Sequence, residues 1–131
     1  MTASVTPFLM FEGQAETAMS LYTSLFENSE IVEIERYGPD GPGTEGSVVK
    51  ACFTLNGRRH YCIDSPAPHE FSFTPAMSLF VDCCDERELD RLFAELSKDG
   101  QILMPLDTYP FARKFAWVAD RFGVSWQLLL A

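Results

Sequence analysis

The sequence predicts an α+β fold in which two βαβββ modules form a curved mixed sheet around a groove. Three observations favour this fold. A strand–helix–strand–strand–strand pattern in the first half recurs in the second, the two helical patterns align about seventy residues apart, and each half carries a hairpin-type turn. The 131 residues suit one domain with a sizeable core, divided into module one (1–64), a linker (65–75) and module two (76–131).

The first half begins with an apolar strand that Gly13 ends, followed by apolar residues at the spacing of an amphipathic helix. Val32-Glu33-Ile34-Glu35 alternates as a half-exposed strand does. Asn56-Gly57 is the strongest short hairpin signal in the chain. The predicted elements are a strand over 5–11, a helix over 14–27, and strands over 30–37, 48–55 and 58–64.

The second half repeats this order after a connection rich in Pro and Phe. Asp85, with Glu88 three residues later, predicts a helix N-cap, and Asp99-Gly100 predicts the end of that helix. Residues 120–123 predict a turn in which Gly123 takes a positive φ. The predicted elements are a strand over 77–83, a helix over 85–98, a short strand over 101–104, and strands over 115–119 and 124–130.

The repeat of the helical pattern supports two modules of the same architecture, and open sheet edges predict that these modules associate. Three apolar positions of the first helix recur in the second: Met19, Tyr22 and Phe26 match Leu89, Leu92 and Leu96. Each module alone is an open sheet with unpaired edges. We therefore expect the modules to close on each other, or on a second chain, around a shared groove.

Charge and composition exclude several classes of partner. Ten basic and nineteen acidic residues give a net charge of −9, which argues against nucleic acid and anionic membranes. No apolar run approaches the ~20 residues that span a bilayer, and no secretion signal is evident. The four cysteines lack C-x-x-C spacing and read as reduced thiols, so a cytoplasmic protein is expected.

The closing strand carries the most informative side chain. Gln127 interrupts an apolar run, so it is either a core glutamine satisfied by neighbouring backbone or the floor of a binding site. Strand alternation places Ser125, Gln127 and Leu129 on one face and Trp126 and Leu128 on the face that packs under the helices.

Three motifs give the chain a family resemblance. Phe11-Glu-Gly-Gln-Ala-Glu16, Leu21-Tyr-Thr-Ser-Leu-Phe26 and Asp120-Arg-Phe-Gly-Val-Ser-Trp-Gln127 resemble those of the vicinal oxygen chelate superfamily, which includes glyoxalase I, bleomycin-resistance proteins and extradiol dioxygenases. Within it the chain is similar to the PhnB-like group, often labelled demethylubiquinone methyltransferase-like. The resemblance covers nearly the whole chain and implies a glyoxalase/bleomycin-resistance-like fold and a homodimer.

The resemblance also implies where a metal ion would bind. Metal-using members hold one divalent ion with four inward His, Glu or Gln side chains, and these positions fall here at Pro7, near Tyr61, at Ala76 and at Gln127. Pro and Ala cannot ligate, so the resemblance implies no complete metal site, and we predict no cofactor. Shifts of one or two positions bring in Thr6, Ser78, Cys62 or Ile63, none of which restores the site.

Six side chains are therefore candidates for ligand binding rather than metal binding: Gln127, Ser125, Tyr61, Trp117, Ser78 and His69. Trp117 and Tyr61 can stack on a flat ligand or simply fill the core. His69, in the linker, can act as an acid or base over the groove or lie exposed in a loop.

The resulting hypothesis is a small-molecule binding protein without the full superfamily metal site. The alternative is a divalent-metal-dependent lyase, isomerase or dioxygenase, and a third is a structural interaction module with an exposed apolar patch. True methyl transfer is not expected, because no glycine-rich strand-to-helix turn for a methyltransferase cofactor is present. The sequence identifies neither the ligand nor any reaction.

Overall fold

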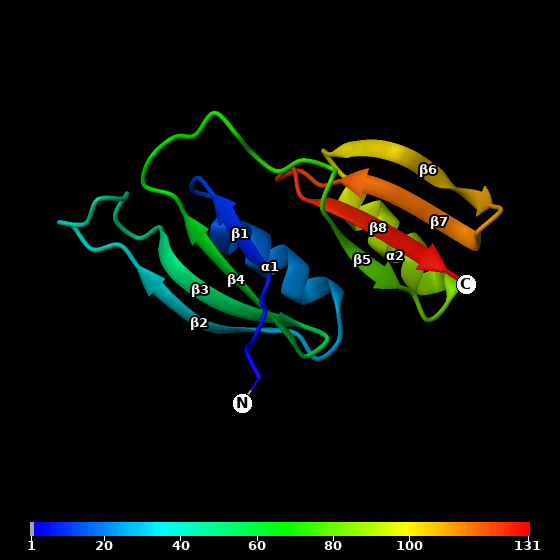
Figure 1. Ribbon diagram of the computed structural model, residues 1–131, viewed down its shortest axis with the longest axis horizontal. Helices are drawn as coiled ribbons and strands as arrows, with labels where there is room; N and C mark the ends of the chain where they lie inside the picture. The colour runs from blue at the N-terminus through cyan, green and yellow to red at the C-terminus, as the bar shows by residue number, and fades with distance from the viewer. Residues whose placement is uncertain (1) are drawn as a thin grey trace. The chain divides into compact units, whose positions relative to one another are not determined.

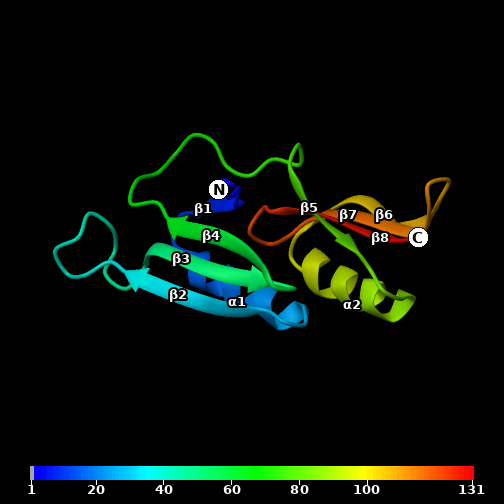
Figure 2. The same ribbon diagram turned by 60° about the horizontal axis from the view of Figure 1, so that its bottom comes forward.

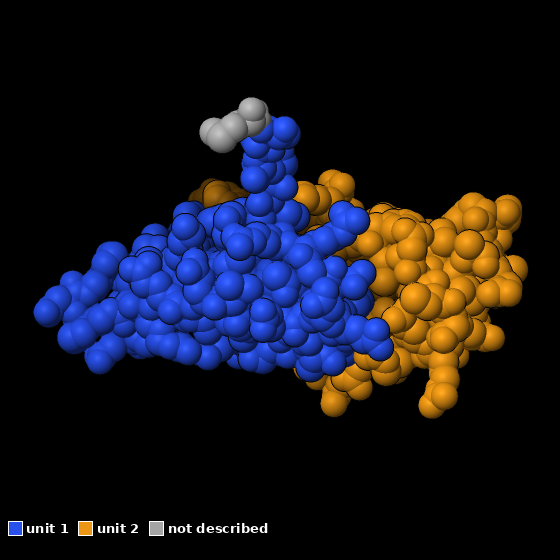
Figure 3. Space-filling view, turned by 90° about the horizontal axis from the view of Figure 1, so that it is seen from below, with its two compact units in different colours: residues 1–69 blue, residues 70–131 orange. Residues whose placement is uncertain are grey.

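The computed structural model describes residues 2–131 and divides into two compact units (Figure 1). Unit 1 comprises residues 1–69 and unit 2 comprises residues 70–131, coloured blue and orange in Figure 3. The described residues form two helices and eight strands, with one helix and one four-stranded sheet in each unit. Each unit has the order β-α-β-β-β, so the prediction of an α+β fold built from two βαβββ modules is confirmed.

Unit 1 is a mixed sheet with one helix on one face (Figure 2). Its strands lie in the order β1-β4-β3-β2, with β1 parallel to β4 and the other neighbours antiparallel. The Asn56-Gly57 turn joins β3 to β4 with φ of 50° and 78°, as a two-residue hairpin turn requires. The elements are β1 (Phe8–Phe11), α1 (Ala15–Leu25), β2 (Glu30–Arg36), β3 (Val48–Leu55) and β4 (Arg58–Asp64).

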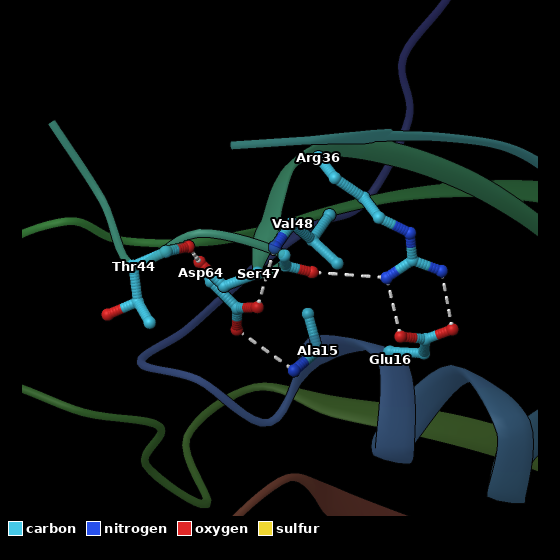
Figure 4. Close-up of polar contacts among 8 residues, drawn as sticks. Ala15, Glu16, Arg36, Thr44, Ser47, Val48 and Asp64 are labelled. Carbon is cyan, nitrogen blue, oxygen red and sulfur yellow. Dashed lines mark hydrogen bonds and ion pairs between the residues drawn. The ribbon is translucent and has the colours of Figure 1, made fainter. Parts of the chain in front are cut away.

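The buried Asp64 carboxylate ties three segments of unit 1 together (Figure 4). Its Oδ1 accepts hydrogen bonds from the backbone N–H groups of Gly13 (2.8 Å) and Ala15 (2.9 Å), where α1 begins. Its Oδ2 accepts from the N–H of Val48 (3.0 Å), the first residue of β3. Asp64 thus supplies the acceptor for the start of α1 that Gln14, at the N-cap position, does not provide.

A surface ion pair joins the first turn of α1 to the end of β2 (Figure 4). Arg36 donates two hydrogen bonds of 2.7 Å to the Glu16 carboxylate, from Nη1 to Oε1 and from Nη2 to Oε2. Its Nη1 also donates to the Gly46 carbonyl oxygen at 3.1 Å. Hydrogen bonding to Arg36 lowers the pKa of Glu16. Glu16 therefore has a structural role, both near the positive end of the helix and in this pair.

Unit 2 repeats the same architecture with the strand order β5-β8-β7-β6. Strand β5 is parallel to β8, and the remaining pairs are antiparallel. Helix α2 packs against β7 and β8 through the fully buried Leu89, Leu92 and Leu96. The elements are β5 (Ser78–Asp82), α2 (Glu86–Ser97), β6 (Gln101–Tyr109), β7 (Ala112–Ala119) and β8 (Ser125–Leu130).

Helix α2 begins as its sequence predicts. The Asp85 side chain accepts a hydrogen bond from the backbone N–H of Glu88 at 2.8 Å, and the Glu88 carboxylate accepts one from the N–H of Cys84 at 2.8 Å. These reciprocal bonds satisfy two otherwise unpaired donors at the start of the helix. The predicted N-cap is confirmed.

The turn between β7 and β8 is organised by a second buried carboxylate, Asp120. Its Oδ1 accepts from the backbone N–H groups of Phe122 (2.8 Å) and Val124 (3.0 Å), and its Oδ2 accepts from the Trp126 indole N–H (2.9 Å). Gly123 has a φ of 91°, as predicted for this reversal. The turn therefore fixes the start of β8 and the orientation of Trp126.

The sequence prediction was wrong about the extent of β6 and β7. Strand β6 continues past the predicted end at residue 104 to Tyr109, and β7 begins at Ala112 rather than at residue 115. Pro105 lies within β6, which is an edge strand whose pairing with β7 is irregular between Met104 and Asp107. An edge strand with a bulge accommodates a proline, because no ladder donor is lost there.

Three of the four free thiols are buried, and Cys84 is exposed. Burial raises the pKa of Cys62 and of Cys83 to about 12, so both stay protonated at neutral pH and act as small core side chains. No helix within residues 2–131 has the length and apolar character needed to cross a bilayer.

Candidate functional site

The candidate site lies on the sheet of unit 2, on the face opposite α2. Strand pairing places Gln127 of β8 between Trp117 of β7 and Phe80 of β5, and Trp117 in turn pairs with Met104 of β6. Directly paired residues present their side chains on the same face. The alternate residues Trp126 and Leu128 are almost completely buried and point to the α2 side, as predicted for the closing strand.

Four of the six predicted side chains meet here in one hydrogen-bonded chain, which we call the polar cluster: Ser78, Trp117, Ser125 and Gln127. The Trp117 indole N–H donates to Ser125 Oγ at 2.8 Å, and Ser125 Oγ lies 2.7 Å from Ser78 Oγ. Gln127 Nε2 then donates to Ser78 Oγ at 3.2 Å. The cluster joins β5, β7 and β8, and none of its side chains is charged at neutral pH.

The direction of the serine–serine bond follows from burial. Ser125 is only 2% exposed, and its other partner, the Trp117 indole, is itself a donor. The hydroxyl hydrogen of Ser125 therefore has one acceptor among the described residues, Ser78 Oγ. Ser78 then accepts two bonds, from Ser125 and Gln127, and its own hydroxyl hydrogen has no acceptor within residues 2–131.

The Gln127 amide is only partly satisfied. One N–H is bonded to a side-chain hydroxyl of the neighbouring strand, not to nearby backbone. Its carbonyl oxygen and second N–H have no hydrogen-bond partner among the described residues, and the side chain is half-buried. The arrangement differs from a core glutamine whose amide is fully paired by the surrounding backbone.

Tyr61 and His69 belong to unit 1 and have partners of their own there. The Lys50 ammonium lies 5.4 Å from the centroid of the half-buried Tyr61 ring. His69 is exposed, and its Nε2 lies 2.8 Å from Ser65 Oγ in the connection that follows β4. Neither side chain takes part in the hydrogen bonds of the polar cluster.

The residues present do not fit the four-ligand metal site of metal-using superfamily members. In each unit the first strand pairs in parallel with the last: β1 with β4, and β5 with β8. The third pair along the first of these ladders is Met10 with Ile63, and the third pair along the second is Phe80 with Gln127. The structural counterpart of Gln127 is thus Ile63, two residues from Tyr61, and isoleucine carries no donor atom. Within the described residues, no three His, Cys, Asp or Glu side chains gather as a metal ion would require.

Comparison with known proteins decides the family. The family model described as 3-demethylubiquinone-9 3-methyltransferase matches residues 3–129. The chain belongs to that family. The predicted PhnB-like group is confirmed by this match and by the PhnB protein described below. No curated protein matches the chain.

Solved structures support the family and the fold. A PhnB protein from Bacillus cereus is 60% identical, with a TM-score of 0.97 over 98% of this chain and 100% of that one. A glyoxalase-related enzyme from Fulvimarina pelagi is 16% identical, with a TM-score of 0.57 over 98% and 89% of the two chains. The fosfomycin resistance protein FosX from Listeria monocytogenes is 10% identical, with a TM-score of 0.59 over 100% and 94%. The last two show the fold alone.

Sequence reasoning missed Phe80 and Met104, the outer members of the row that contains Trp117 and Gln127. Phe80 is 52% exposed, which is unusual for a large apolar side chain in a strand. Phe80 follows Ser78 by two positions, so strand alternation alone would have placed both side chains on the same face of the sheet. Its place beside Gln127 depends on the parallel register of β5 and β8, which the sequence does not reveal.

Proposed function

We propose that this PhnB-like protein binds a small organic molecule on the unit 2 sheet, over the polar cluster. The observation that carries the proposal is the unfilled hydrogen-bonding capacity of Gln127 and Ser78 beside the exposed ring of Phe80. A half-buried amide and a hydroxyl with spare donors and acceptors, flanked by aromatic side chains, are the usual components of a ligand site.

A purely structural role would leave this arrangement unexplained. Polar groups in a strand interior lower stability unless they are paired, and here the side-chain hydrogen bonds of Trp117, Ser125, Ser78 and Gln127 within the described residues are all made to one another. That network orients the Gln127 amide and leaves its carbonyl oxygen and one N–H without a partner among the described residues. Orientation of a recognition group by a supporting network is what binding requires.

The proposed binding needs no resident metal ion. The donor set at the four positions that the resemblance implies is poor: Pro7 and Ala76 have no side-chain ligand atom, and near Tyr61 the counterpart of Gln127 is Ile63, which has none either. Methyl transfer as named by the family description is not part of the proposal. The turns that lead from β1 to α1 and from β5 to α2 contain only one glycine between them, Gly13, and lack a glycine-rich cofactor loop.

The test is to find and map a ligand. Native mass spectrometry of the purified protein identifies a co-purifying molecule, and titration of a fragment library followed by ¹H–¹⁵N NMR maps where ligands bind. We expect the largest shifts at Ser78, Trp117 and Gln127, and a loss of affinity of about tenfold or more in Gln127→Leu, which removes the free amide edge.

The matched control is Gln14→Leu, the same change at an exposed glutamine before α1 in unit 1, which is expected to leave binding unchanged. Fragments that bind only elsewhere, or that bind Gln127→Leu as well as the wild type, would contradict the proposal. Stoichiometric Ni, Zn, Fe or Mn that disappears in Gln127→Ala would instead favour the metal-dependent lyase, isomerase or dioxygenase.

A further inference from the structure

We infer that the ligand of the polar cluster is a neutral, planar molecule that presents a hydrogen-bond donor and acceptor side by side, as a lactam or cis-amide does. This inference rests on the proposed function and specifies the chemical class of the ligand. Three features of the cluster lead to it: its lack of charge, the free edge of the Gln127 amide, and the aromatic side chains on both sides of that amide.

The first feature is charge. The cluster contains two hydroxyls, one amide and one indole, so it has no group to neutralise an ionised ligand. Asp82, which follows Phe80 by two positions on β5 and so projects from the same face, carries the nearest formal charge along that strand. Arg113 of β7 shares the face of Trp117 but lies four positions along the strand, so a carboxylate or phosphate over Gln127 would lose hydration without meeting a cation in the polar cluster, whereas a neutral ligand avoids that cost.

The second feature is the pattern of unused donors and acceptors. Because one Nε2–H is committed to Ser78, Gln127 keeps one N–H and its carbonyl oxygen. We assign the N–H that points away from the carbonyl oxygen to Ser78, so that the other N–H and the oxygen pair with a partner offering an acceptor next to a donor, in the same way that glutamine reads adenine. The Ser78 hydroxyl hydrogen adds one further donor beside this edge.

The third feature is shape. Trp117 and Phe80 occupy the strands on either side of Gln127 in register with it, and neighbouring strands lie about 4.8 Å apart. A flat ring system that pairs with the Gln127 amide therefore has aromatic surface on both sides. Phe80 exposes about half of its surface, and covering it gives apolar contact that a small polar ligand would not supply.

The test compares three probes that share one bicyclic ring. 2-Quinolone carries the lactam N–H and C=O, 1-methyl-2-quinolone lacks the donor, and quinoline-2-carboxylate is anionic. Dissociation constants come from ¹H–¹⁵N NMR titration of the full chain. We expect 2-quinolone to bind at the polar cluster at least about tenfold more tightly than either of the other probes, because methylation leaves the Gln127 oxygen unpaired.

Two variants identify the groups responsible. Gln127→Glu keeps the size of the side chain but replaces the N–H with a second acceptor and adds a charge, so it is expected to remove the preference for 2-quinolone. Ser78→Ala is expected to weaken 2-quinolone binding to a smaller extent. Backbone amide spectra of both variants, recorded without probe, establish that each remains folded.

Equal affinities for 2-quinolone and its N-methyl derivative, tighter binding of the carboxylate, or no binding of any probe would overturn the inference. These results are distinguishable from failure of the proposed function. If library fragments of another class bind over Gln127 and lose affinity in Gln127→Leu, the site stands and only the ligand class is wrong.

Discussion

At the scale of single residues, each unit contains one buried aspartate whose carboxylate accepts hydrogen bonds from several segments of the chain. Asp64 accepts three backbone N–H groups from the start of α1 and the start of β3, and Asp120 accepts two backbone N–H groups and the Trp126 indole N–H. Each carboxylate uses both oxygens. Asp120 was recognisable in the sequence as part of a turn, whereas the partners of Asp64 are 16 to 51 residues away and leave no local pattern.

Asp64→Asn should therefore lower the free energy of unfolding by about 1–3 kcal/mol, because the new amide group cannot accept the hydrogen bonds that one carboxylate oxygen receives. Urea denaturation followed by circular dichroism measures the change. Asp40→Asn, in the exposed loop after β2, is the matched control and should change stability little. Equal effects of the two substitutions would show that the Asp64 network contributes nothing particular.

His60 is expected to make the stability of unit 1 depend on pH. The ring is buried and stacks on Phe53 with centroids 5.1 Å apart, and burial lowers the pKa of His60 below its usual value of 6.5. At pH values between the lowered pKa of folded His60 and the usual value of 6.5, the unfolded chain binds more protons at His60 than the folded chain does. The stability contributed by neutral His60 is thus present above about pH 6.5 and lost as the pH falls through the folded pKa.

We expect the free energy of unfolding to fall between pH 7.5 and pH 5.5, and His60→Gln to reduce that fall. Denaturation curves at several pH values measure it. His69→Gln, at the only other histidine of the chain and an exposed one, should leave the pH dependence unchanged. A wild-type slope that persists in His60→Gln would assign the effect to other groups.

At the scale of elements, local patterns predicted most of the fold. The Asn56-Gly57 hairpin, the Asp85 N-cap and the Gly123 turn rest on neighbouring residues, and all three are present. The long β6 was missed because tolerance of Pro105 depends on its edge position, a tertiary property. The shared face of Ser125 and Gln127 followed from strand period, but the bonds to Ser78 cross 47 and 49 residues and needed the parallel register.

The junction between α2 and β6 depends on a glycine for space. A Cβ at Gly100 would overlap the backbone carbonyl oxygen of Ala119, to which the chain cannot adapt by rotating a side chain. Gly100→Ala should cost about 1–3 kcal/mol of unfolding free energy. Thermal or urea denaturation measures it.

Gly38→Ala is the matched control, because nothing lies within 4 Å of a Cβ at that position and its φ is not positive. It should be neutral or slightly stabilising, since alanine restricts the unfolded chain. If Gly100→Ala is as well tolerated as Gly38→Ala, the close approach of residues 100 and 119 is not a constraint on the fold.

At the scale of the whole molecule, the two units share topology but not surface chemistry. The pairs Phe8 with Tyr61 and Met10 with Ile63 in unit 1 occupy the places that Ser78 with Ser125 and Phe80 with Gln127 occupy in unit 2. The repeat therefore carries the polar cluster in one copy only. Topology was predictable from the repeat because apolar periodicity fixes it, whereas the difference between the faces depends on a few individual substitutions.

The unpaired sheet edges lead to a prediction about assembly. Strands β1 and β2 end one sheet and β5 and β6 end the other, so each described sheet has two edge strands. We propose, with the family resemblance, that the protein forms a homodimer that shields part of these edges. Sedimentation equilibrium should give about twice the 14.7 kDa of one chain. A mass equal to one chain at micromolar concentration would contradict this expectation.

The two tryptophans differ in their surroundings, which gives the proposed binding a fluorescence test. The Trp126 indole is sealed in the core against the Asp120 carboxylate, whereas the half-buried Trp117 indole is bonded to Ser125 within the polar cluster. If a molecule binds over Gln127 as proposed, we expect the emission of Trp117 to change and the emission of Trp126 to stay constant. A Trp126→Phe chain would therefore contain a single tryptophan, Trp117, at the candidate site, and exciting tryptophan selectively would follow binding with no label attached.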